Sequence, residues 1–115
     1  MANKIKIQRL ESQILNIINR TIVLEVNDRI AKLGRITYVK LSNELSILKA
    51  YVDCQDRNKI PKVVEALNKI SGLFRSKIAS SISTYKSPRI IFEIDKTIDY
   101  AKNIDKIIRK LHEEK

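Results

Sequence analysis

The stretch that most constrains the fold runs from Pro61 to Arg89. Two apolar stripes at helical spacing follow one another there, and the pair Ser71-Gly72 stands between them. Glycine costs about 1 kcal/mol relative to alanine inside a helix, and Gly72 is one of only two glycines in the chain. We therefore expect two helices with a sharp kink, in which Ser71 caps the second helix and Gly72 bends the backbone. The stripes are Val63, Val64, Leu67 and Ile70, then Leu73, Phe74, Ile78 and Ile82.

The charge of the same stretch is one-sided. No acidic residue occurs between Ala66 and Phe92, and the whole chain of 115 residues carries a formal charge of +10. Neutralising phosphates releases counterions, so this balance favours a nucleic acid as partner. No apolar run approaches the roughly 20 residues of a membrane span, and no signal-peptide pattern follows Met1. The cations of the stretch are Lys69, Arg75, Lys77, Lys86 and Arg89.

Aromatic residues make up only 5% of the chain, and tryptophan is absent. Surfaces on which bases could stack should be sparse, which favours recognition of the RNA backbone or shape over a stacking sheet. A single cysteine excludes an internal disulfide and fits a reducing cytosol.

The remaining chain alternates between helical and strand periodicity. We expect a first helix over residues 4–26, a linker over 27–34, and a β-hairpin of strands 35–41 and 45–54. In the first strand Thr37, Val39 and Leu41 share one face, and Ile36, Tyr38 and Lys40 share the other. In the second strand the predicted core face is Leu48, Ala50, Val52 and Cys54. The predicted apolar stripe of the first helix is Ile7, Leu10, Ile14, Ile17, Ile18 and Leu24.

A third strand follows Pro88, with Ile90, Phe92 and Ile94 on one face, and a last helix should span residues 96–111. The order α-β-β-α-α-β-α predicts a single α+β domain, with helices packed on one face of a three-stranded sheet.

Recognisable chemistry is scarce. The two glycines lie far apart, which excludes dinucleotide loops, P-loops and the GxxG loop of standard KH domains. Cys54 lies on an apolar strand face, and His112 lies in the last turn of a helix. Glu93 and Asp95 form an acid pair without a further acid–base partner on the neighbouring strand. The sequence therefore predicts no catalytic residue, no metal and no cofactor.

Three segments, residues 38–52, 67–75 and 87–95, resemble the ribosome-binding factor A family of bacteria. They read YVKLSNELSILKAYV, LNKISGLFR and SPRIIFEID, and with Arg29 the resemblance spans about residues 4–112. It implies a type II KH-like fold in which an interhelical kink, Ala-x-Gly in the family, replaces the GxxG loop. Here the kink reads Ile70-Ser71-Gly72, and the family's Asp-Pro-Arg loop reads Asn27-Asp28-Arg29.

The resemblance also implies a function. Members of the family are not enzymes. They bind the free 30S ribosomal subunit and its 16S rRNA in the cytoplasm, support late maturation and 5′-end processing of that RNA, and are linked to growth in the cold. We expect a monomer without a membrane partner.

Three hypotheses follow for this chain. In the first, RNA phosphates are contacted by Lys69, Arg75, Lys77, Lys86 and Arg89, with Arg29 as a helper. In the second, the chain is a protein-docking module without direct RNA contact, which uses the exposed hairpin face (Ile47, Tyr51) or the last helix. In the third, the chain is a hydrolase that uses Glu93 and Asp95.

Overall fold

A computed structural model describes residues 4–82 and 87–95. The predicted helix over 96–111 and the cation Lys86 lie outside these residues. The helices are α1 (Lys4–Glu25), α2 (Ile60–Lys69) and α3 (Ser71–Ser81), and the strands are β1 (Arg35–Leu41), β2 (Ile47–Asp53) and β3 (Arg89–Ile94). Two short 3₁₀ turns, Ala31–Leu33 and Arg57–Lys59, precede β1 and α2.

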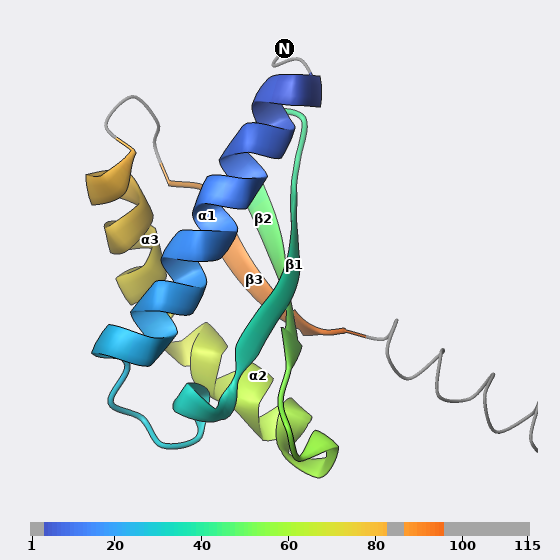
Figure 1. The fold of residues 1–115 in the computed structure, drawn as a ribbon, viewed down its shortest axis with the longest axis vertical. Helices are drawn as coiled ribbons and strands as arrows, with labels where there is room; N and C mark the ends of the chain where they lie inside the picture. Colours follow the sequence, from blue (N-terminus) through green and yellow to red (C-terminus); the bar gives the residue numbers. More distant parts are fainter. Residues whose placement is uncertain (1–3, 83–86, 96–115) are drawn as a thin grey trace, which may run out of the picture.

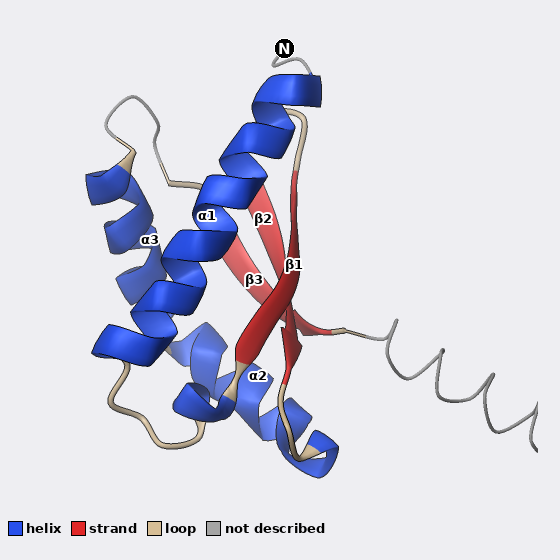
Figure 2. Ribbon diagram, in the orientation of Figure 1, coloured by secondary structure: helices blue, strands red, loops and turns tan. Residues whose placement is uncertain are grey.

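The three strands form one mixed sheet in the order β1-β2-β3 (Figure 2). β1 and β2 are antiparallel and joined by a short turn, whereas β2 and β3 are parallel. Parallel neighbours require a long crossover connection, and here α2 and α3 supply it. β1 and β3 are therefore the two outer strands of the described sheet.

All three helices pack on one face of this sheet (Figure 1). α1 lies against β1 and α3, and α2 lies against β3. Because the helices cover only one face of the sheet, buried and exposed residues alternate along each strand. The predicted α+β arrangement is thus confirmed, and the buried strand residues are Ile36, Val39, Leu41, Leu48, Ala50, Val52, Ile90 and Phe92.

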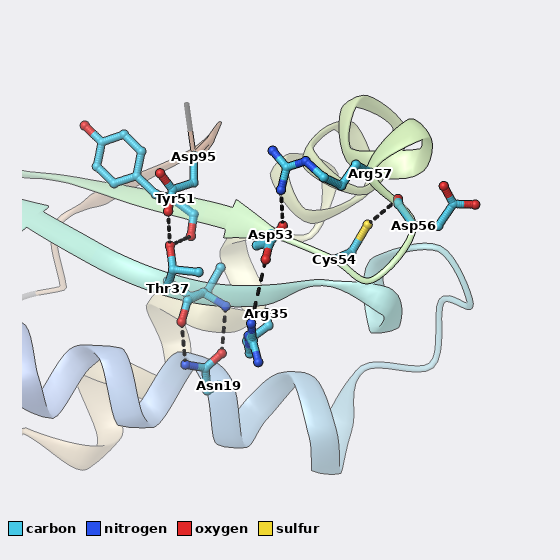
Figure 3. Close-up of polar contacts among 10 residues, drawn as sticks. Asn19, Arg35, Thr37, Tyr51, Asp53, Cys54, Asp56, Arg57 and Asp95 are labelled. Atoms are coloured by element: carbon cyan, nitrogen blue, oxygen red, sulfur yellow. Dashed lines mark hydrogen bonds and ion pairs between the residues drawn. The ribbon is translucent and has the colours of Figure 1, made fainter. Parts of the chain in front are cut away.

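A β-bulge at Thr37 breaks the predicted alternation in β1. The register of β1 on β2 shifts between Ile36 and Tyr38, so Ile36 joins the covered face and is only 2% exposed. The prediction that Ile36 shares a face with Tyr38 is therefore wrong, because the bulge inserts one unpaired residue. The Thr37 hydroxyl donates to Oδ2 of Asp95 at 2.6 Å and also lies 3.3 Å from the Tyr51 carbonyl oxygen (Figure 3).

One strand boundary and one buried helix position also differ from the sequence prediction. β2 begins at Ile47, not at residue 45, because the Ser42 hydroxyl accepts hydrogen bonds from the Ser46 and Ile47 amides. In α1, Leu24 is 70% exposed, and Ile22 occupies the core in its place. Ile22 follows Ile18 at a four-residue step, so the buried side of the helix runs along that row.

The outer edge of β1 is occupied by a side chain of α1. The Asn19 amide group donates to the Ile36 carbonyl at 2.9 Å and accepts from the Ile36 backbone N–H at 2.9 Å (Figure 3). Both backbone groups point away from β2 and would otherwise lack a partner within the sheet. The bulged start of β1 is thereby fixed to the middle of α1.

The connection between α1 and β1 approaches α2 closely. The Asp28 carboxylate accepts hydrogen bonds from the backbone N–H groups of Ile30 (2.8 Å) and Ala31 (2.9 Å) and so starts the 3₁₀ turn. Gly34 follows this turn, and a Cβ atom there would lie 2.7 Å from Cγ1 of Val63 and 3.2 Å from Cδ1 of Leu67. Glycine at position 34 is therefore required for the packing of this connection on α2.

Candidate nucleic-acid interface

The joint between α2 and α3 is a single residue, Ile70, with φ −109° and ψ 22°. The predicted break is confirmed, but it lies one residue before Ser71-Gly72. Ser71 is already the first residue of α3, and no side chain caps that helix, so the predicted capping role of Ser71 is wrong. Both predicted apolar stripes contribute to the core. The buried residues are Ile60, Val63 and Leu67 of α2, and Phe74 and Ile78 of α3.

Gly72 has no special geometry at this joint. Its φ is negative, and a Cβ atom built on it would meet nothing within 4 Å. The expectation that Gly72 answers a geometric need is wrong, because Ile70 makes the turn and Gly72 lies in a regular, exposed helix position.

Side-chain contacts fix the joint to β3. The Asn68 amide group donates to the Phe92 carbonyl at 3.1 Å and accepts from the Phe92 N–H at 2.9 Å. Beneath this contact, the Phe74 and Phe92 rings pack edge to face with centroids 5.2 Å apart. The last turn of α2, the first turn of α3 and the outer edge of β3 therefore form one surface.

This surface contains a groove of about 550 Å³ between the helix joint and the start of β3. Two arginines line it, and none of its lining residues is acidic. A groove with two guanidinium groups and polar Ser71 and Asn68 side chains is suited to bind phosphate groups. We call it the joint groove; its lining residues are Asn68, Ser71, Arg75, Arg89, Ile90 and Ile91.

The structure brings together only some of the predicted cations. Arg75 and Arg89, fourteen residues apart in sequence, meet in the joint groove and are both exposed. Lys69 ends α2 and lies 3.4 Å from the Glu65 carboxylate, which is a helical i,i+4 pair. This pair is largely exposed and so contributes little to stability.

Lys77 and Arg29 lie elsewhere. The Lys77 ammonium lies 2.6 Å from the Glu25 carboxylate, beside a crevice between α1 and α3. Since Arg75 and Lys77 are two residues apart in a helix, their side chains leave α3 in nearly opposite directions. Arg29 is exposed in the turn that follows α1, beside the capping residue Asp28. The predicted set therefore divides into a groove pair and separate surface cations.

Sequence reasoning missed the role of Asn68. An asparagine in the last turn of an amphipathic helix is usually a solvated residue, and only the tertiary fold reveals that its amide meets an outer strand. A polar residue on the edge of an apolar stripe, near a predicted outer strand, is the one signal that could have indicated this contact.

Two of the residues that could suggest catalysis, Cys54 and Asp95, make structural contacts, and His112 lies outside the described residues. The Cys54 thiol is buried and donates to the Asp56 carbonyl at 2.9 Å (Figure 3), and burial, with nearby Asp53 and Asp56, raises its pKa. A thiol with a raised pKa is a poor nucleophile at neutral pH. Asp95 is 8% exposed and accepts the Thr37 hydrogen bond, so it stabilises the bulge of β1.

Within residues 4–82 and 87–95, no three His, Cys, Asp or Glu side chains gather closely enough to hold a metal ion. In the same part of the chain, no helix is both long and apolar enough to cross a bilayer.

Comparisons with known proteins identify the family and the fold of this chain. The model of the family described as ribosome-binding factor A matches residues 6–108. A ribosome-binding factor A from Ureaplasma urealyticum is 48% identical over 114 residues, which cover 99% of this chain and 98% of the relative.

Solved structures share the fold. A solution structure from Thermotoga maritima has a TM-score of 0.69 at 26% identity and covers 84% of this chain and 92% of its own. A homology model of the Thermus thermophilus ribosome-binding factor A, fitted into a cryo-EM map of a 30S complex, gives a TM-score of 0.62 at 22% identity and covers 76% of this chain and 93% of its own. The sequence match over nearly the whole length and the shared fold lead to one conclusion: this chain belongs to the ribosome-binding factor A family.

Proposed function

We propose that this protein binds the free 30S ribosomal subunit through its 16S rRNA and supports late maturation of that RNA, including processing of its 5′ end. It acts as a monomer in the cytoplasm and carries out no catalysis itself. Family membership supports the ribosomal partner, and the Thermus relative is described in complex with the 30S subunit.

The observation that carries the RNA contact is the joint groove. Arg75 from α3 and Arg89 from β3 converge there beside two polar side chains, and no acidic residue lines it. Arginine guanidinium groups bind phosphate oxygens with paired hydrogen bonds, and these two lie at the same groove although the sequence separates them. The Asn68–Phe92 hydrogen bonds hold α2 on β3, and the Phe74–Phe92 ring contact holds α3 on β3. These contacts fix the placement of both arginines, which suits recognition of an RNA backbone of defined shape.

The test is co-sedimentation of the protein with purified free 30S subunits and with 70S ribosomes at several salt concentrations. We expect salt-sensitive association with 30S subunits and much weaker association with 70S ribosomes. The double variant Arg75→Gln/Arg89→Gln should bind 30S subunits more weakly, and the slope of log K against log salt should fall by about two. Lys32→Gln/Lys62→Gln removes the same charge from exposed positions outside the groove and should bind nearly as the unmodified protein does.

Equal losses in the two double variants would mean that net charge, not the joint groove, governs binding. Binding that stays flat as salt rises would favour the protein-docking module instead, because phosphate contacts must be salt-sensitive. In cells whose only copy carries the arginine double variant, 16S rRNA with an unprocessed 5′ end should accumulate.

A further inference from the structure

The face of the sheet that the described helices leave uncovered carries two stacked tyrosine rings. Tyr38 of β1 and Tyr51 of β2 are cross-strand neighbours, with ring centroids 5.0 Å apart and planes inclined by 18°. Tyr38 is 51% exposed. Regular alternation after the bulge places Tyr38 on this face together with Lys40, opposite the buried Val39 and Leu41.

The next row of the same face pairs two lysines. Lys40 of β1 stands directly opposite Lys49 of β2, and both are exposed. Like charges directly opposite each other destabilise a sheet. No ion pair joins either lysine to a carboxylate of the described residues. An anion placed between the two ammonium groups would remove their repulsion.

We propose that this surface, the tyrosine–lysine patch (Tyr38, Lys40, Lys49 and Tyr51), binds a single-stranded segment of RNA, with a base stacked on the Tyr38 ring and a phosphate between Lys40 and Lys49. The proposal rests on the proposed function in that the RNA is ribosomal. It adds a second contact surface, formed by different residues from those of the joint groove.

The arrangement favours a single strand over other partners. A flat exposed ring can stack on a base only where that base is unpaired and splayed out, and duplex RNA does not offer its bases in this way. Tyr38 and Lys40 are two residues apart in one strand, hence about 7 Å apart, which places the stacking surface and the anion site within the span of a few nucleotides. An apolar protein helix would use the rings but would leave the lysine pair without a counter-charge.

Two acidic residues border the tyrosine–lysine patch on the side of Tyr51. Glu93 of β3 is the partner of Tyr51 on its other side, and Asp53 follows two residues further along β2. Burial and the neighbouring Glu93 raise the pKa of Tyr51. A tyrosine hydroxyl is protonated at neutral pH even without such a shift, so the Tyr51 hydroxyl can donate a hydrogen bond. The RNA phosphates should therefore follow the lysine row and turn away from Glu93.

This structure changes the expectation drawn from composition. A content of 5% aromatic residues predicts few stacking surfaces, yet the fold places two of these few rings side by side on one exposed face. Scarcity along the chain is therefore compatible with one local stacking site.

The test uses the full chain, a fluorescein-labelled ten-nucleotide uridine RNA, and a duplex RNA of equal length. We expect tighter binding of the single strand, with quenching of tyrosine fluorescence. Tyr38→Leu should weaken single-strand binding by about tenfold and remove part of the quenching. Lys40→Gln/Lys49→Gln should weaken it similarly and lower the salt slope by about 1.4. Lys32→Gln/Lys62→Gln is the charge-matched control, and thermal melting checks that each variant folds.

The outcomes separate this proposal from the proposed function. If Tyr38→Leu and the Lys40/Lys49 variant bind the single strand as the unmodified protein does, the patch is not an RNA site, and the co-sedimentation result for Arg75 and Arg89 stands unaffected. The patch is likewise excluded if RNA binds without any change in tyrosine fluorescence, as expected if a protein partner occupies this face. Loss of single-strand binding in the patch variants alone supports the proposal, even if the arginine variant sediments normally.

Discussion

The two glycines of this protein occupy positions of opposite character, one closely packed and one open. Gly34 lies between α1 and β1, where a methyl group would come within 2.7 Å of Val63. Gly72 lies in the first turn of α3, where a methyl group would meet nothing within 4 Å. Neither has a positive φ, and the one residue in the described chain that does is Leu45, at 63°.

The difference shows that rarity in the sequence does not identify the glycine that the fold needs. Gly72 stands between two helical stripes and so attracts attention, whereas Gly34 stands in an ordinary linker. The distance to the neighbouring element decides which glycine is needed: the backbone at Gly34 is packed against Val63 and Leu67 of α2, whereas a Cβ atom at Gly72 would have no neighbour within 4 Å.

The largest effect should come from Gly34→Ala. The new Cβ would overlap the Val63 side chain, which is buried and β-branched and so has little freedom to move away. We expect a loss of about 1–3 kcal/mol in the free energy of unfolding, measured by urea denaturation. Val63→Ala in the same background should recover part of that loss, although Val63→Ala alone destabilises the protein. An unchanged midpoint for Gly34→Ala would remove the contrast between the two connections.

A second pair of variants compares the side chains that begin the two connections. Asp28→Ala removes the carboxylate that accepts from the Ile30 and Ala31 amides and should cost about 1 kcal/mol. Ser71→Ala should change stability by less than about 0.5 kcal/mol, because Ser71 caps nothing. Thermal melting of both proteins distinguishes them, and equal losses would show that Ser71 has a capping role after all.

The smallest effect, and the only gain, should come from Gly72→Ala. The site has a negative φ and free space, so alanine removes backbone entropy from the unfolded chain and adds helix propensity. We expect stabilisation of about 0.4–1 kcal/mol in urea denaturation. A gain would agree with the finding that Ile70, not Gly72, makes the turn between the two helices. Any clear destabilisation by alanine would restore a special role for Gly72.

Hydrophobic periodicity was sufficient to predict most of the fold. It predicts the buried faces of β2 and β3 and the buried rows of α2 and α3. A sheet covered on one face gives its strands a hydrophobic period of two residues, and a helix packed on one side has a period near 3.6 residues. It failed at Thr37, since a bulge has no signal in a run of alternating residues, and at Leu24, where two neighbouring rows were equally apolar.

The candidate site was only partly predictable. The acid-free stretch indicates Arg75 and Arg89, but not that they meet, because that depends on how α3 and β3 are placed by the tertiary fold. The same stretch suggested Lys77 equally strongly, yet Lys77 pairs with Glu25 of α1, which lies far away in sequence. Composition describes which charges exist, and only the fold sorts them among surfaces.

The two asparagines that bind the outer strands, Asn19 and Asn68, both precede those strands in the order of synthesis. A growing sheet with unpaired outer strands can add strands from other molecules and aggregate. Asn19 precedes the Ile36 groups that it binds, so the outer edge of β1 can be occupied as soon as the strand leaves the ribosome. Asn68 likewise precedes Phe92 and awaits β3. Each outer strand thus emerges after the asparagine that binds part of its backbone, so those backbone groups have a partner within the same chain as soon as the strand is made.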